Sequence, residues 1–318
     1  MNITSIHRSD NGGGASKVAM NLHSNIPKHG ANSRVIVAKK ETNNPDVYQI
    51  PKTGWIQFWN SIGKRLLKSE VKGAYRLYKI FKLIKSPYRE YFHKVGKENY
   101  HQPATNKIIN QFKATTDIFH LHNLHYDYFD LRLLPSLSKD KPVLITLHDE
   151  HLYTGLCAST LGCERWRIGC GDCPQLENYP MFKRDNTHFN WCRKKAIFDE
   201  SQLTLVTPST WLAERTRESF LSHLPVKVIP NGVDLALFKQ GSKACARENL
   251  GFDQDAFIIL SLCKKGREGK YKDKQMLKRV IQRLQKMTFD KLIIIVILGS
   301  SSLNDESINN IRVIEKPF

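Results

Sequence analysis

A histidine and an aspartate, His148 and Asp149, directly follow an apolar and β-branched run, Val143–Leu147. The run shows no polar alternation, which predicts a strand buried on both faces, as in a parallel sheet. Ligands of open α/β sheets bind beyond the carboxyl ends of the strands. His148 and Asp149 are therefore candidates for chemistry at this edge of the sheet. A histidine of the core or a helix cap is the alternative for His148.

Four cysteines, Cys157, Cys163, Cys170 and Cys173, follow in a loop predicted over residues 155–174. Their spacing, C-x5-C-x6-C-x2-C, would let four thiolates close a tetrahedral zinc site that stabilises a polar loop. The spacing is not a standard zinc-finger pattern, so a redox pair or reduced, packed cysteines remain alternatives. A zinc ion with four protein ligands has no open position, so the metal predicted here is structural, not catalytic.

A glycine run, Gly12 to Gly14, stands between a short predicted strand (Ile3–His7) and an apolar-periodic helix that includes Val18 and Leu22. Bare backbone N–H groups at such a turn bind anions, helped by the helix dipole. The run is neither G-x-G-x-x-G nor a Walker loop. A tight turn that needs a positive φ is the alternative.

Three histidines, His120, His122 and His125, lie at or just beyond a predicted strand, Asp117–Leu121. Spaced histidines suggest a metal ion. Alternation of side chains along the strand, and the lack of a carboxylate with obvious ligand geometry, argue against a shared metal. The sequence favours a role for these histidines in lining a pocket.

The chain is strongly basic, with 49 Lys and Arg against 30 Asp and Glu, a formal charge of +19 and a pI near 9.6. This excess predicts an anionic partner: nucleic acid, an acidic membrane surface or a phosphorylated substrate. No known nucleic-acid-binding motif is present, so no nucleic acid partner is predicted. Hydrophobic residues make up 41% of the chain, which argues against wholesale disorder.

The sequence also bears on cellular location. Its first residues lack the layout of a signal peptide, and its longest apolar run, Leu292–Leu298, is too short to span a bilayer. Seven cysteines in a chain of 318 residues do not resemble a secreted disulfide framework. We therefore expect a cytoplasmic protein.

Residues 64–97 combine Lys and Arg with apolar residues at three- and four-residue spacing, and the aromatic residues Trp55, Phe58 and Trp59 precede them. This pattern predicts a basic amphipathic helix on an anionic membrane surface, which would make the protein peripheral on the inner face of the cytoplasmic membrane. A helix that packs its apolar stripe on the domain is the alternative.

Predicted strands and helices alternate along the chain, which indicates an α/β fold with parallel sheets. The Pro230–Asp234 segment, PNGVD, is a strong chain punctuator where the composition changes. We place the domain boundary there, with an N-terminal domain over residues 1–230 and a second unit over 231–318. The second unit has three predicted strands, at Ala256–Leu262, Lys291–Leu298 and Ile311–Ile314.

The chain resembles the family 4 glycosyltransferases of GT-B fold, of the bacterial exopolysaccharide, capsule and colanic-acid type. The matching segments are SDNGGGASKVAMNLH (9–23), HLHNLHYDYFDL (120–131), the long cysteine-rich stretch 146–180, and TPSTWLAERTRESFL (207–221) with VKVIPNGVDLALF (226–238). The resemblance covers nearly all of the first domain and is looser in the second.

This resemblance implies a retaining transfer of a sugar from a nucleotide-diphospho-sugar donor to a lipid-linked saccharide acceptor in surface polysaccharide biosynthesis. It also implies two Rossmann-like domains, the first mainly holding acceptor and the second mainly holding donor. No metal is implied for catalysis, because basic residues and helix termini would stabilise the leaving diphosphate.

The resemblance carries over to single residues. His148 matches an active-site histidine near the transferred sugar, and Asn231 lies at the hinge between the domains. The matches to donor diphosphate-binding residues are Gly13, Gly14, Arg267 and Lys272. An arginine fork and a lysine point charge suit phosphoryl oxygens. Asp273 stands where the family usually has glycine, and Lys270 competes with Lys272 for its role.

One family feature has no match. Family members carry a glutamate-x7-glutamate segment late in the second domain, near the donor sugar and ribose. Glu306 and Glu315 are nine residues apart and lack its glycine context, so neither is assigned. The sequence thus predicts a second domain that is truncated. A catalytically inactive remnant, or a module that binds acceptor or membrane, is the alternative function.

Overall fold

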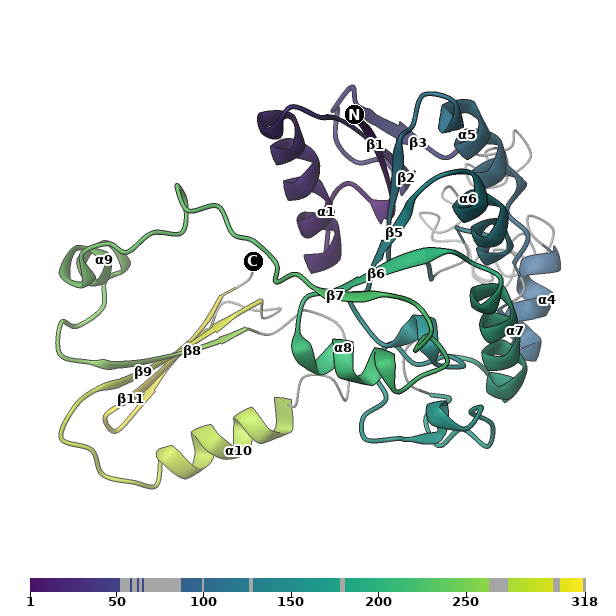
Figure 1. Ribbon diagram of the computed structural model, residues 1–318. Coiled ribbons are helices and arrows are strands. Elements are labelled where there is room, and N and C mark those ends of the chain that lie inside the picture. The colour runs from purple at the N-terminus through teal and green to yellow at the C-terminus, as the bar shows by residue number, and fades with distance from the viewer. Residues whose placement is uncertain are drawn as a thin grey trace. The chain divides into compact units, whose positions relative to one another are not determined.

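Figure 1 shows the protein as a computed structural model. The structure describes residues 1–51, 58, 62, 65, 87–98, 100–125, 128–177, 181–262, 274–299 and 304–316. The chain divides into two compact units, Met1–Gly232 and Val233–Phe318. The boundary inferred from the sequence, between residues 230 and 231, lies close to this division.

The first unit is built on a seven-stranded parallel sheet of order β3-β2-β1-β4-β5-β6-β7. The middle of this sheet is apolar. Paired positions on the neighbouring strands β1, β4, β5 and β6 carry Ile6, Leu121, Ile145 and Leu205, which are all fully buried. The strands are β1 (Asn2–Ser9), β2 (Asn32–Lys39), β3 (Val47–Gln49), β4 (Ile118–His122), β5 (Val143–Thr146), β6 (Leu203–Thr207) and β7 (Val226–Val228).

Helices cover both faces of this sheet, with α1 on one side and α5, α6 and α7 on the other (Figure 1). The Ser209 hydroxyl accepts a hydrogen bond from the Leu212 N–H and so caps the N-terminus of helix α8. The helices are α1 (Gly14–Asn25), α4 (Pro87–Val95), α5 (Pro103–Lys113), α6 (Leu134–Asp140), α7 (Thr187–Asp199) and α8 (Thr210–Arg217), with short 3-10 turns η1 (Ile26–His29), η2 (Leu131–Leu133), η3 (His151–Tyr153) and η4 (Arg165–Arg167).

The strand order reverses direction between β1 and β4. From β1 the chain proceeds outward to β2 and β3, whereas from β4 it proceeds the other way to β5, β6 and β7. In open α/β sheets such a reversal opens a crevice beyond the carboxyl ends of the strands, where ligands bind. The turn after β1 and the turn after β4 therefore mark the expected site.

The second unit has a four-stranded sheet of order β10-β11-β9-β8, in which only β10 runs antiparallel. Strand β10 and helix α9 have no counterpart in the sequence-based prediction, since β10 (NDESI) is polar and lies at an edge, where no apolar run marks it. The elements are α9 (Lys243–Leu250), β8 (Phe257–Leu262), α10 (Lys274–Leu284), β9 (Ile293–Leu298), β10 (Asn304–Ile308) and β11 (Ile311–Lys316). The predicted α/β fold class, with a Rossmann-like first domain and a second α/β unit, is confirmed.

Two sequence-based predictions fall largely outside the described residues. The basic amphipathic segment is described only at Arg65 and from Pro87 onward, and Arg267, Lys270 and Lys272 lie outside the described residues altogether. Within the described ranges, no helix has both the length and the apolar character needed to cross a bilayer.

Candidate functional site

His148 lies just beyond β5 and contacts His122, the last residue of β4. The His122 Nδ1 and His148 Nε2 atoms are 3.0 Å apart, and the two rings are nearly parallel, at 23°. The contact follows from strand order, because β4 and β5 are neighbours and His122 pairs with Thr146 in their register. His122 is fully buried, whereas His148 is partly exposed, so of these two rings only His148 is open to solvent.

Two further imidazoles complete a histidine cluster, which consists of His7, His120, His122 and His148. The rings of His120 and His122 are 4.1 Å apart, and His120 Nε2 lies 2.7 Å from the Thr146 hydroxyl. His7 meets His122 edge-on at 6.2 Å. The argument that strand alternation separates these histidines was wrong for His120 and His122, because residues two apart on a strand face the same way.

Burial keeps the four imidazole rings of the histidine cluster uncharged. Desolvation lowers the pKa of His7 and of His120 to about 4, and it lowers the pKa of His122 and His148 as well. The four rings are therefore neutral near pH 7. Both ring nitrogens of His7, and Nε2 of His122, are buried and lack a hydrogen-bond partner among the described residues.

The glycine turn joins β1 to α1 next to this cluster in the sheet. Gly13 is the N-cap of α1, with no side-chain cap, and Gly14 begins the helix. Gly12 has a φ of +125°, so a positive φ is needed there but not at Gly13. A Cβ at Gly13 or Gly14 would meet no atom within 4 Å, which leaves open space at the helix N-terminus for a ligand.

A buried ionic network supports the loop that follows His148. Lys194 of α7 is fully buried, and its ammonium group lies 2.8 Å from Glu98 and donates to the carbonyls of His151 and Thr154. Burial alone would raise the pKa of Glu98, but the charges of His151 and Lys194 outweigh burial and lower it. Asp149, also in this loop, lies 3.1 Å from His125 Nε2. These contacts fix the backbone that leads away from His148.

A cavity opens beside this network. The sequence favours a role in lining a pocket for His120, His122 and His125, and of these three His125 lines this cavity, together with His151, Glu98 and Arg193. The rest of the lining is aromatic or aliphatic and comes from Tyr100, Phe129, Leu124 and Leu131. Within the described parts of the chain, no group of three or more His, Cys, Asp or Glu side chains is arranged to hold a metal ion.

The four cysteines line a second cavity, with Trp166 at its wall. All four are free thiols. A shared hydrogen bond raises the pKa of Cys157 and lowers that of Cys173, and burial raises the pKa of Cys170 to about 11. The loop thus gathers the cysteines but does not arrange them as metal ligands. The structural zinc remains a prediction.

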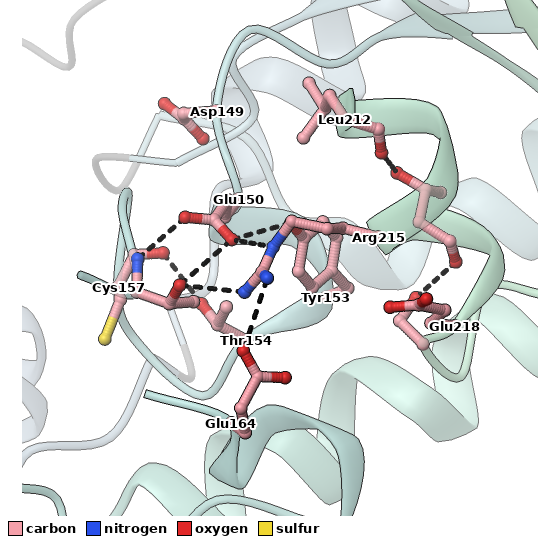
Figure 2. Close-up of polar contacts among 12 residues, drawn as sticks. Asp149, Glu150, Tyr153, Thr154, Cys157, Glu164, Leu212, Arg215 and Glu218 are labelled. Atoms are coloured by element: carbon pink, nitrogen blue, oxygen red, sulfur yellow. Dashed lines mark hydrogen bonds and ion pairs between the residues drawn. The ribbon is translucent and has the colours of Figure 1, made fainter. Parts of the chain in front are cut away.

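Arg215 ties the cysteine-bearing loop to helix α8, and Figure 2 shows its polar contacts. Its guanidinium donates to Glu150 at 2.8 Å and to the Thr160 hydroxyl at 2.9 Å, and reaches Glu164 at 3.3 Å. It also lies over the Trp166 ring, 4.7 Å from its centroid. Glu150, only 2% exposed, additionally accepts hydrogen bonds from the Thr160 N–H and the Tyr153 hydroxyl.

Of the remaining predicted site residues, Arg267 and Lys272 lie outside the part of the chain that the structure describes. Asn231 is exposed at the end of the first unit. The sequence reasoning missed Glu98, Lys194 and Arg215 as supports of the site. Arg215 stands within a segment that carries the family resemblance, which was an available signal. Nothing local to the sequence marks Lys194, one basic residue among many.

Two comparisons of the sequence with known proteins found matches to glycosyltransferases. Residues 12–237 match the model of "Glycosyltransferase Family 4". A protein of Escherichia coli (strain K12), named as a colanic acid biosynthesis glycosyl transferase, WcaC, is 35% identical over 130 residues, which is 37% of this chain and 32% of that protein. The chain thus matches about a third of that relative's length.

Solved structures resemble the whole chain more distantly. Sucrose-phosphate synthase from Thermosynechococcus elongatus aligns with a TM-score of 0.49 at 13% identity, over 95% of this chain and 63% of its own. Anabaena Alr3699/HepE, solved in complex with UDP, aligns with a TM-score of 0.49 at 13% identity, over 94% of this chain and 61% of its own.

Proposed function

Because the chain belongs to glycosyltransferase family 4, we propose that it acts in the transfer of a sugar from a nucleotide-diphospho-sugar to a saccharide acceptor. One observation carries the proposal. His148 and the glycine turn stand at the carboxyl ends of β5 and β1, on strands that flank β4 at the reversal of strand order. The name of the colanic acid relative supports a role in polysaccharide biosynthesis.

Each residue takes the role that the family resemblance gives it. The open N-terminus of α1, at Gly13 and Gly14, binds the donor diphosphate through backbone N–H groups. Arg267 and Lys272 neutralise the same diphosphate, His148 contacts the transferred sugar, and Asn231 is the hinge. The transfer retains the anomeric configuration and needs no metal ion, and the acceptor is a lipid-linked saccharide.

Donor binding is the first test. Calorimetric titration of the folded chain with a panel of UDP- and GDP-sugars should give saturable binding to one donor. His148→Ala should weaken this binding or abolish transfer, whereas His29→Ala, which changes an exposed histidine of η1, should leave both unchanged. A folded chain that binds no donor would favour the alternative, a module that binds acceptor or membrane without turnover.

Transfer assays test the finer parts of the proposal. With the donor that binds, the anomeric configuration of the first-formed product, read by NMR, should match that of the donor. A chelator should not reduce the rate of transfer, since no metal ion takes part in the chemistry. An inverted product, or loss of activity that a divalent ion restores, would contradict these parts.

The membrane surface is a separate part of the proposal. Helix α4 exposes Tyr88 and Tyr91 beside Arg89 and Lys94, and aromatic and basic residues together are typical of a helix on an anionic bilayer. The chain should co-sediment with vesicles that contain anionic lipid and less so at high salt. Tyr88→Ser with Tyr91→Ser should weaken this binding, and equal binding to neutral vesicles would contradict it.

A further inference from the structure

The contact between His122 and His148 constrains where their protons lie. Burial lowers the pKa of both rings, so each is neutral and carries a single N–H. Only one proton can occupy the 3.0 Å contact between His122 Nδ1 and His148 Nε2. The contact therefore has two arrangements, in which either His122 or His148 is the donor.

The buried end of His122 distinguishes the two arrangements. Its Nε2 atom is buried and has no hydrogen-bond partner among the described residues. If His148 donated, His122 would carry its proton on this Nε2 and bury an N–H without an acceptor, which native proteins rarely tolerate. If His122 donates from Nδ1, its Nε2 is a bare lone pair and no donor is orphaned.

The backbone of His122 is held in place for this contact. The buried Tyr128 hydroxyl lies 2.9 Å from the carbonyl of His122 and 3.0 Å from that of Asn123. Asn123 has a φ of +46°, a left-handed conformation that this contact helps to hold. The end of β4 is thus a rigid support for the His122 ring.

We propose that His122 is a positioning residue that holds His148 in the tautomer with its proton on Nδ1. His148 then presents an N–H donor, not a lone pair, on its partly exposed side, where it has no partner among the described residues. The group it recognises is an oxygen acceptor of the donor substrate, such as a sugar hydroxyl. This role for His148 rests on the proposed function, whereas the tautomer itself does not.

The test reads the tautomer directly. Long-range 1H–15N correlation spectra of the full chain, labelled at histidine and without substrate, distinguish a protonated from a bare ring nitrogen. We expect Nδ1–H for His148 in the wild-type chain. A wild-type His148 protonated at Nε2 would overturn the proposal, and this measurement needs no variant to fold.

Two variants of nearly equal size separate hydrogen bonding from packing. His122→Asn keeps an N–H donor near the position of Nδ1 and should preserve the Nδ1–H form of His148. His122→Leu removes the donor and should shift His148 toward Nε2–H. An unchanged tautomer in His122→Leu would show that His122 does not position His148.

Kinetic measurements then test whether the tautomer of His148 affects the rate of sugar transfer. His122→Leu should lower kcat roughly 10-fold or more with a smaller change in KM, the loss typical of one misplaced hydrogen-bond donor, and His122→Asn should restore much of it. If the spectra are as expected but the wild-type chain binds no donor, the proposed function fails and the positioning role stands. Equal kcat in wild type and His122→Leu would overturn the link to catalysis.

Discussion

Neutral, buried imidazoles distinguish the first domain at the scale of single residues. His7, His120 and His122 lie at or near the carboxyl ends of β1 and β4, and desolvation lowers the pKa of each. A ring that stays neutral in the folded chain but takes up a proton when unfolded makes folding sensitive to acid. This sensitivity is separable from that of carboxylates, whose unfolded pKa values lie lower.

Stability should therefore fall as the pH drops from about 6.5 to about 4. In this range the unfolded chain binds more protons than the folded one, so the free energy of unfolding rises with pH. At about 1.4 kcal/mol per pKa unit, His7 and His120 each account for roughly 3 kcal/mol. Urea denaturation at several pH values measures this loss.

The matched variants for this prediction are His120→Gln, which keeps a polar partner for Thr146, and His29→Gln, which changes an exposed ring. The first should flatten the dependence of stability on pH, and the second should not. Identical pH dependence in wild type and His120→Gln would show that the half-buried His120 ring does not resist protonation.

The cysteines give a second prediction at the residue scale. In the chelator-treated chain Cys173 should be alkylated before Cys157, because their shared hydrogen bond lowers the pKa of Cys173 and raises that of Cys157. The exposed Cys192 and Cys245 serve as internal references. Peptide mass spectrometry after brief treatment with iodoacetamide gives the order, and faster reaction of Cys157 would contradict it.

The same experiment tests whether the four cysteines bind a structural zinc ion. If the four cysteines hold zinc, the chain as purified contains one zinc ion and protects all four from alkylation until a chelator releases it. A chain without zinc, whose Cys173 reacts at once, would refute the zinc site and leave a cavity lined by free thiols.

At the scale of elements, the first domain holds a long irregular loop against a helix. The loop after η3 contains few hydrogen-bonded elements, and several of its residues, including Cys170 and Asp172, have positive φ. Arg215 of α8 forms a long-range ion pair with the buried Glu150 and a second one with Glu164. Helix α8 therefore holds this loop together with helix α7, whose Thr187 and Trp191 also form hydrogen bonds with it.

Arg215→Ala should destabilise the first domain by roughly 3–5 kcal/mol, because it leaves the carboxylate of Glu150 buried without its charged partner. Arg217→Ala, on the same helix but exposed, should cost about 1 kcal/mol or less. Chemical denaturation of the two variants makes the comparison. A similarly small loss of stability in both variants would mean that the neutral hydrogen-bond donors around Glu150 are enough to stabilise its buried carboxylate.

At the scale of the whole molecule, the two units differ in how much apolar surface they bury. One large cluster, with Phe119, Leu121 and Phe198 among its members, fills the core of the first. The second has a small cluster on each face of its sheet, around Ile295 and Ile294. Its strand β8 leaves Phe257, Leu260 and Leu262 more than half exposed at an edge.

Amide hydrogen exchange should therefore be faster in the second unit than in the first. Opening the second unit exposes less buried apolar surface, so its strands should open at a lower free energy than β4 and β5. Mass spectrometry of peptides that cover β9 and β5, the most apolar strands of each sheet, gives the comparison. Equal protection of these strands would contradict it.

Much of this architecture could be predicted from the sequence. Unbroken apolar runs such as Val143–Leu147 mark strands because a buried strand must be apolar on both faces. Their alternation with helices predicts the parallel order, and the glycine run predicts the turn after β1. The polar strand β10 was missed, since an edge strand forms from backbone pairing and needs no apolar pattern.

The sequence by itself determined the α/β class, the strands β1, β4 and β5 of the central sheet, and the placement of His148 beyond a strand end, because these depend on local apolar patterns. Only the tertiary structure brought His122 to His148 and Arg215 to Glu150. Those contacts join residues far apart in the chain, and strand order and register decide them. Local periodicity carries no information on which strands become neighbours, so the partners of each site residue emerged only from the folded chain.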